Sequence, residues 1–222
     1  VSAYLYLFDK MTGKKGERDI RYVFIDEVQD YTPFQLAFLK FSFPRARFTL
    51  LGDLNQAIFT KENSHTLLSE LSTMFDPEKT RVVQLTQSYR STQQITDFTR
   101  HILVNGEAVT AFDREGQLPN VTLAADEQGA LQALIKQVDQ NNQDKETTAI
   151  IGKTLKQCRA LAKQLKEAGV RATLIQSENQ RLASGVIIVP SFLAKGLEFD
   201  AVIVWEASDE NYFEEDDRQL LY

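Results

Sequence analysis

Short apolar runs recur along the chain and alternate with stretches whose apolar residues follow the period of an α-helix. Such runs predict strands, and they occur at residues 22–25, 48–51, 82–85, 121–124, 149–151, 172–175, 186–189 and 201–205. The helical period is clearest at residues 127–140 and 155–168, and a helix is also expected from Thr92 onward. This alternation predicts an α/β fold, in which right-handed crossovers build a mostly parallel sheet with helices on both faces.

A charged, proline-containing stretch at residues 76–80 separates two strand-rich blocks and predicts a domain boundary. The predicted domains are residues 1–80 and 81–222. The first contains only two clear strands, which is too few for a complete doubly wound sheet. We therefore expect one partial and one nearly complete domain.

The net charge of −6 depends on one acidic cluster within residues 209–217. Without the six acids of this cluster, the 25 Lys and Arg residues would be balanced by 25 Asp and Glu residues, so the charge excludes neither DNA nor other partners. The cluster itself is consistent with a solvated loop, a contact to a basic partner or a repulsive gate against nucleic acid. The single cysteine, Cys158, favours a reducing, cytoplasmic location, and no apolar run is long enough to span a bilayer.

Candidate chemistry begins where the first predicted strand ends in Asp26 and Glu27. In open α/β sheets ligands bind at the carboxyl ends of strands, where an acidic pair can hold a metal ion and activate a water molecule. The strand at residues 48–51 likewise ends in Gly52 and Asp53, with Gln56 close behind. Two such strand ends predict one shared site, although an isolated acidic pair can also simply face solvent.

Two further segments carry residues suited to nucleotide binding. Tyr89 and Arg90 follow a predicted strand, where the ring can stack on a base and the guanidinium can contact a phosphate. Between the last two predicted strands, Gly196 lets the backbone approach a ligand and Glu198 can accept hydrogen bonds from a ribose hydroxyl. Taken singly, each segment is also compatible with an ordinary surface pair or turn.

Taken together, the four segments resemble, in this order, the second to fifth motifs of the helicase superfamily that includes UvrD, Rep and PcrA. They are residues 26–30 (Asp-Glu-Val-Gln-Asp), 51–59 (Leu-Gly-Asp-Leu-Asn-Gln-Ala-Ile-Phe), 88–91 (Ser-Tyr-Arg-Ser) and 194–200 (Ala-Lys-Gly-Leu-Glu-Phe-Asp). The resemblance implies RecA-like domains of the P-loop NTPase type, with ATP and Mg²⁺ clamped between two lobes. The implied roles are magnesium binding by Asp26, water activation by Glu27, sensing of the terminal phosphate by Gln56, adenine stacking by Tyr89, an arginine finger at Arg90, close approach of the backbone to the nucleotide at Gly196 and ribose binding by Glu198.

Two parts of the family pattern are missing from these residues. The phosphate-binding loop GxxxxGK[ST] does not occur, because Gly152-Lys153-Thr154 is preceded five positions earlier by Thr147 rather than glycine. Lys153 is therefore expected to be an exposed residue after a strand. The last residues, 219–222, resemble only the start of the sixth motif. The resemblance thus implies a C-terminal fragment of a larger motor that is inactive alone and able to self-associate through an uncovered apolar sheet face.

Several departures point to the HelD branch of this superfamily, also called DNA helicase IV-like. Residues 60–63 read Thr-Lys-Glu-Asn where unwinding members carry Trp-Arg-Gly-Ala, and Pro190 and Phe192 replace threonine and histidine in the fifth motif. Phe59 and Phe192 can stack on nucleic-acid bases, or they can be core residues. The parent protein is thus predicted to be an ATP-dependent DNA helicase or translocase, or alternatively a factor that releases RNA polymerase from nucleic acid. A third reading, a degenerate binding module, is disfavoured because Asp26, Glu27, Gln56 and Arg90 are all present.

Overall fold

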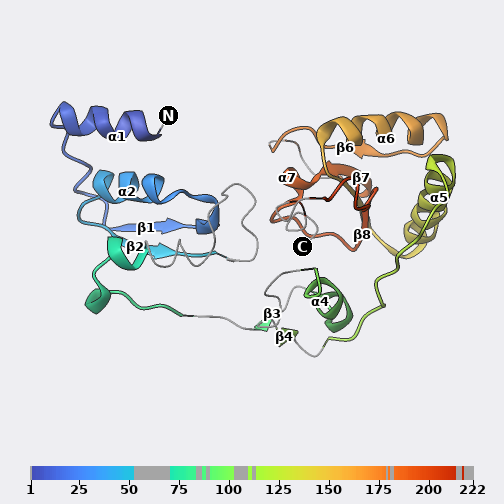
Figure 1. Ribbon diagram of the computed structural model, residues 1–222, viewed down its shortest axis with the longest axis horizontal. Helices are drawn as coiled ribbons and strands as arrows, with labels where there is room; N and C mark the ends of the chain where they lie inside the picture. The colour runs from blue at the N-terminus through green and yellow to red at the C-terminus, as the bar shows by residue number, and fades with distance from the viewer. Residues whose placement is uncertain are drawn as a thin grey trace. The chain divides into compact units, whose positions relative to one another are not determined.

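The computed structural model describes residues 2–52, 71–83, 87–88, 91–102, 110–111, 114–178, 180, 183–213 and 217. The chain divides into two compact units, Val1–Ser88 with Leu103–Thr110 and Tyr89–Ile102 with Ala111–Tyr222. Each unit contains parallel strands and helices (Figure 1), which confirms the predicted α/β class.

In unit 1, α1 (Ser2–Met11) and α2 (Pro33–Ser42) lie on one side of a two-stranded parallel sheet, and residues 71–74 are also helical. The unit also contains β1 (Tyr22–Ile25), the 3-10 helix η1 (Val28–Asp30), β2 (Arg47–Leu50) and the 3-10 helix η3 (Pro77–Lys79). Helix α2 begins with a capping box: the Thr32 hydroxyl accepts from the backbone amide of Gln35, and the Gln35 side-chain oxygen accepts from the backbone amide of Thr32. Its Leu36 packs on Ile25 and Val28 to form a small core.

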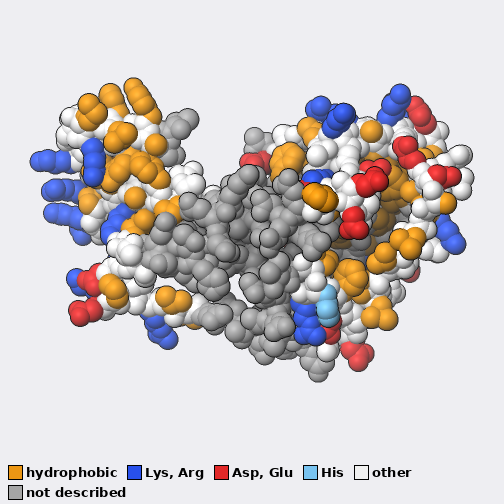
Figure 2. All heavy atoms as spheres, viewed as in Figure 1, with side chains coloured by type: hydrophobic (Ala, Val, Ile, Leu, Met, Phe, Trp, Pro, Cys, Tyr) orange, Lys and Arg blue, Asp and Glu red, His pale blue; other side chains and the backbone are white. Residues whose placement is uncertain are grey.

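The opposite face of this sheet carries exposed aromatic residues. Tyr22 and Phe24 of β1 are 62% and 71% exposed, whereas Val23 and Ile25 point toward α2. Further apolar side chains are exposed over α1 (Figure 2), and Tyr4 of this helix is 73% exposed. The predicted apolar surface on the first domain is therefore present in the described residues.

Unit 2 contains a four-stranded, all-parallel sheet with the strand order β6-β7-β5-β8. Its elements are α4 (Gln93–Thr99), α5 (Glu127–Asp144), β5 (Thr147–Gly152), α6 (Leu155–Glu167), β6 (Thr173–Leu174), β7 (Gly185–Pro190), α7 (Ser191–Ala194) and β8 (Ala201–Val204). A separate two-stranded sheet pairs β3 (Gln87–Ser88) with β4 (Thr110–Ala111), and all of its residues except Ala111 are assigned to unit 1. Helix α6 ends near the predicted point, since its C-cap Ala168 is followed by Gly169 at φ +81°.

One face of the four-stranded sheet is covered by helices, and the other is covered at β7 but open at β8, where Val202 is 52% exposed on the side that carries Ala149 and Ile187. Helices α5 and α6 pack on the face that carries Ile150 and Ile188, while Leu193 and Phe199, from α7 and the segment after it, pack on the face that carries Ile187. Strand β7 is buried along nearly its whole length, as expected for a strand with helices or loops on both sides.

One predicted strand is wrong, and a second is wrong in the part that the structure describes. Residues 121–124 form no strand, and their apolar side chains are exposed, with Leu123 at 93%. Val82 and Val83 also lie outside any strand and are exposed, whereas residues 84–86 lie outside the described part of the chain. An apolar run becomes a strand only where a partner strand supplies the ladder of hydrogen bonds, and these runs have none in the described residues.

Candidate functional site

The acidic pair lies immediately after β1, where the sequence predicted it. Asp26 is exposed and Glu27 is half-buried. The backbone amide of Glu27 donates to Asp26 Oδ1 at 2.9 Å. Glu27 adopts the left-handed backbone conformation, with φ 51° and ψ 45°. Among the described non-glycine residues, the only other one with a positive φ is Glu206. Such strained residues cluster at functional sites, so the conformation marks this turn as a candidate site.

Backbone hydrogen bonds fix both ends of this turn to the second strand. Leu51 donates to the carbonyl of Ile25 at 2.8 Å and accepts from the amide of Val28 at 2.9 Å. Because β1 and β2 are parallel, with Ile25 opposite Leu50, their carboxyl ends lie at the same edge of the sheet. The two predicted strand ends therefore do come together, with the acidic pair held between two anchored residues.

Gln29 is a site residue to which sequence reasoning gave no role. Its side chain is only 1% exposed, and its Nε2 donates to Glu27 Oε2 at 2.5 Å. A Cβ atom at Gly52 would lie 2.3 Å from Gln29 Oε1, so the amide occupies the space that a side chain at position 52 would need. The only signal in the sequence is a glycine directly after a strand, which does not by itself identify its neighbour.

In unit 2, a side-chain hydrogen bond joins the carboxyl ends of β5 and β7. Ser191 Oγ donates to the carbonyl oxygen of Lys153 at 3.1 Å. After β5 the chain continues into α6 on one face of the sheet, and after the adjacent β7 it continues into α7 on the other face. Open α/β sheets bind ligands at such a switch point. Phe192 follows Ser191 and is 41% exposed at this edge.

The segment between α7 and β8 carries Gly196, predicted to let the backbone approach the nucleotide, and Glu198, predicted to bind the ribose. Gly196 adopts φ +77°, a conformation that L side chains rarely adopt, which accounts for glycine here. Glu198 is exposed. Two residues later, Asp200 accepts from the amide and the hydroxyl of Thr147, both at 2.8 Å, at the start of β5. Glu198 thus lies on the return from the carboxyl edge of the sheet to its amino edge.

The prediction that Lys153 is exposed is wrong. Its side chain is 24% exposed and forms an ion pair with Asp217 at 2.6 Å. Its Nζ also donates to the carbonyl oxygen of Asn211 at 2.5 Å and lies 5.5 Å from the ring centroid of Tyr212. The segment after β8 folds over the end of β5 and encloses the ammonium group. One acid of the predicted acidic cluster therefore has an internal structural contact.

The neighbours of Lys153 also have structural explanations. A Cβ atom at Gly152 would lie 2.8 Å from the Sγ of Cys158, which is fully buried. Thr154 is the N-cap of α6 and forms a capping box with Gln157. The Gly-Lys-Thr tripeptide is thus accounted for by packing, an internal ion pair and a helix cap, without a bound phosphate.

We expect Gly152→Ala to destabilise unit 2 by about 1–3 kcal/mol, because the added methyl overlaps a buried sulfur that cannot move into solvent. In a Cys158→Ala background the same substitution should cost less, since the sulfur is gone. Denaturant unfolding of the two single variants and the double variant measures this coupling. Strictly additive costs would contradict the contact.

Burial also perturbs Tyr212, which is 4% exposed. Burial, followed by the negative charge of Asp217, raises the pKa of the Tyr212 phenol to about 12. In an unfolded chain a tyrosine ionises at about pH 10, so the folded state keeps its proton where the unfolded state loses it. This contribution to stability is complete below about pH 10 and is lost as the pH rises toward 12.

Accordingly, the unfolding midpoint of the wild-type chain should fall more steeply between pH 10 and pH 12 than that of Tyr212→Phe, which has no phenol to ionise. Urea unfolding at a series of pH values provides the measurement. Identical pH slopes for the two proteins would show that Tyr212 does not titrate differently in the two states.

Comparison with known proteins identifies the family of this chain. A family model described as the UvrD/REP helicase N-terminal domain matches residues 7–74. Among solved structures, the chain is similar to the crystal structure of the C-terminal domain of a possible DNA helicase from Lactobacillus plantarum WCFS1. The two are 58% identical, with a TM-score of 0.53, over 61% of this chain and 78% of that chain. The chain belongs to the UvrD/REP helicase family. No curated protein gives a significant match.

UvrD/REP helicases use ATP with Mg²⁺ in general, and the described residues can be tested for a fit to the metal. No three His, Cys, Asp or Glu side chains gather as a metal site in the part of the chain that the structure describes. Mg²⁺ needs no such cluster, because it keeps several waters and binds through one or two carboxylates together with substrate phosphates. The exposed carboxylate of Asp26 fits this requirement.

Five residues that the resemblance to helicases singles out lie outside the described residues. They are Asp53, Gln56, Phe59, Tyr89 and Arg90. The structure therefore brings together Asp26, Glu27 and Gly52 on unit 1. On unit 2 it places Phe192 at the carboxyl edge of the sheet and Glu198 on the return to β8.

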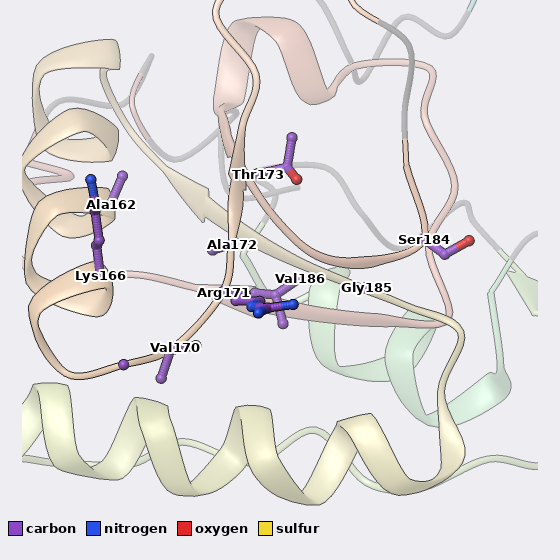
Figure 3. A pocket seen from close by; sticks show the side chains of 10 residues that line it. Ala162, Lys166, Val170, Arg171, Ala172, Thr173, Ser184, Gly185 and Val186 are labelled. Carbon is purple, nitrogen blue, oxygen red and sulfur yellow. The ribbon is translucent and has the colours of Figure 1, made fainter.

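Two other features of this helicase-family chain are separate from the candidate site. A hollow of about 570 Å³ lies where β6 and β7 begin (Figure 3), with Lys166, Arg171 and Ser184 among its lining residues. It lies at the amino edge of the sheet, opposite the end that carries Ser191 and Phe192. In addition, no helix within the described ranges combines the length and apolar character needed to cross a bilayer.

Proposed function

We propose that this chain supplies catalytic and nucleic-acid-binding residues of an ATP-dependent DNA helicase or translocase, which couples ATP hydrolysis to movement on nucleic acid. The observation that carries the proposal is the Asp26–Glu27 turn, held by Leu51 at the carboxyl edge of a parallel sheet. This turn falls within the stretch that matches the UvrD/REP model. Phosphoryl transfer needs a metal-binding carboxylate and a group that orients the attacking water, and the turn offers both.

In this proposal, Asp26 holds magnesium, which when bound neutralises charge on the phosphates. The half-buried carboxylate of Glu27 accepts a proton from the attacking water. The remaining roles follow from the resemblance: Gln56 senses the terminal phosphate, Tyr89 stacks on adenine, Arg90 is the arginine finger, Gly196 lets the backbone approach the nucleotide and Glu198 binds the ribose.

We further propose that these residues form the C-terminal part of a longer motor, with residues 1–80 from its first RecA-like domain and 81–222 from its second. The 222 residues contain no phosphate-binding loop, and the backbone donors of that loop carry much of the phosphate binding. ATP hydrolysis is therefore to be measured on a protein that joins this chain to such a loop. The exposed Tyr22 and Phe24 support self-association when the chain is isolated.

Nucleic-acid binding is assigned to Phe192, with Phe59 as a second aromatic contact. Phe192 is 41% exposed at the edge of the sheet, so its ring is accessible to a base instead of enclosed in the core. Stacking of one base on such a ring contributes roughly 1–3 kcal/mol and does not require a particular sequence.

A second candidate function is that of HelD-type proteins, in which the motor releases RNA polymerase from nucleic acid. Sequence features favour it: residues 60–63 lack the stacking tryptophan of unwinding helicases, and Phe192 stands where those proteins have histidine. About a hundred residues separate the fourth and fifth motifs, which is too short for the large insertion of UvrD.

The two candidates are separated by paired assays on the longer protein. A helicase or translocase hydrolyses ATP faster when single-stranded DNA is added, and an unwinding enzyme displaces an annealed strand. A HelD-type factor copurifies with RNA polymerase and, when ATP is added, releases it from a DNA template without strand displacement. Both proposals would be overturned if single-stranded DNA did not stimulate ATP hydrolysis and the protein neither displaced an annealed strand nor released RNA polymerase.

A further inference from the structure

The turn that carries Glu27 is anchored through its backbone, but a backbone anchor does not fix the end of a long side chain. Glutamate has three rotatable side-chain bonds, and its carboxylate can sweep over several ångströms unless something holds it. At a site that must orient a water molecule, a displacement of about 1 Å can reduce the rate by about 10²-fold. A partner for the Glu27 carboxylate is therefore of functional interest.

Gln29 is placed to be that partner. The two residues are separated by one position, and the 3-10 helix η1 turns the chain so that Gln29 Nε2 donates to Glu27 Oε2 at 2.5 Å. Because Gln29 is 1% exposed, its amide is held by the surrounding protein. Fixing one carboxylate oxygen in this way also sets the direction of the other.

Gly52, at the end of the second strand, completes the arrangement. A side chain at this position would start 2.3 Å from Gln29 Oε1 and 2.8 Å from Val28 Cγ1. Gly52 carries no positive-φ strain that would explain a glycine, since no left-handed φ is recorded for it. The close approach of the Gln29 amide, with Val28 Cγ1 beside it, is the structural reason for glycine at this position.

We propose that Gln29 is a positioning residue, which holds the Glu27 carboxylate toward the attacking water, and that Gly52 is required because the Gln29 amide fills the space beside it. The inference rests on the proposed role of Glu27. A neutral amide suits this role, because it can be buried without the desolvation cost of a charged donor.

The test uses the longer protein with its phosphate-binding loop and compares steady-state ATP hydrolysis. Gln29→Met keeps the length and approximate volume of the side chain but removes the donor, and it should lower kcat by about 10–10²-fold with little change in KM for ATP. Gly52→Ala, which displaces the amide, should have a similar effect. The matched control is Gln164→Met, since Gln164 Nε2 also donates to a glutamate, Glu127 Oε1, at 2.6 Å, but on the helical side of unit 2. This control should leave kcat unchanged.

Folding and mechanism are separated by two further measurements. Unfolding midpoints are determined for each variant, and if Gln29→Met lowers the midpoint, Gln29→Asn is used, because its amide is retained but is too short to reach Glu27. Adding Gln29→Met to Glu27→Gln should cause no further loss, since a positioning residue acts only through the group it positions. A wild-type kcat in folded Gln29→Met and Gln29→Asn overturns the inference. So does an equal loss of kcat when Gln29→Met is introduced into the wild-type protein and into Glu27→Gln. Wild-type turnover in Glu27→Gln would instead overturn the proposed function.

Discussion

Replacing Glu27 by glutamine is expected to lower ATP turnover by about 10²–10⁴-fold in the protein that joins this chain to a phosphate-binding loop. Glutamine preserves the size of the side chain, and its carbonyl oxygen can still accept the bond from Gln29 Nε2. It cannot take up the proton of the attacking water, so the loss should appear in kcat. Nucleotide binding should be retained, because the proposed role of Glu27 concerns the water and not the nucleotide. Phosphate release at saturating ATP and single-stranded DNA measures kcat, and equilibrium binding of ATP measures nucleotide affinity.

The chain offers a matched control at Glu206. Glu206 is the other described non-glycine residue with positive φ, at 53°, and its carboxylate likewise accepts from a glutamine, Gln157, at 3.1 Å. It follows β8 in unit 2, whereas the acidic turn belongs to unit 1. Glu206→Gln therefore reproduces the chemical change and the backbone context without touching the proposed base, and it should leave turnover unchanged. Retention of more than about a tenth of the wild-type rate by Glu27→Gln would contradict a role as general base.

The sequence was most informative where local signals agree with tertiary contacts. Strands β5, β7 and β8 were predicted from apolar runs, and helix α6 from its period and the glycine that follows it. The position of Asp26 and Glu27 after β1 also followed from the pattern, because a polar pair directly after an apolar strand marks its end. These features depend on neighbours within a few residues, which a sequence displays directly.

The sequence was least informative where a residue is explained by a distant partner. Lys153 Nζ donates to the carbonyl oxygen of Asn211, which lies 58 positions away in the sequence, and no local signal indicates that contact. Gln29 is a polar residue that is almost completely buried, whereas polarity alone predicts exposure. Conversely, the apolar residues 121–124 are exposed because no strand pairs with them in the described part of the chain.

The second large effect is expected in the core of unit 2, where Ile188→Ala should destabilise the unit by about 2–5 kcal/mol. Ile188 is fully buried in β7, lies opposite Leu174 on one side and Ile150 on the other, and packs under α5 and α6. Its truncation removes apolar contacts and leaves a cavity that the paired strands cannot close. Hydrogen exchange of the β5 and β7 amides measures the effect in this unit separately from unit 1.

Two companion variants make the test specific to the arrangement of layers. Val202 of β8 is 52% exposed, so Val202→Ala, also a truncation of a β-branched residue, should change stability by no more than about 0.5 kcal/mol. Ile187 neighbours Ile188 but points to the opposite face, where it is fully buried beside α7. Ile187→Ala should therefore be as costly as Ile188→Ala. If it behaved like Val202→Ala, the face beneath α7 would be open to solvent, and the short crossover that carries Ser191 and Phe192 would not be packed on the sheet that positions them.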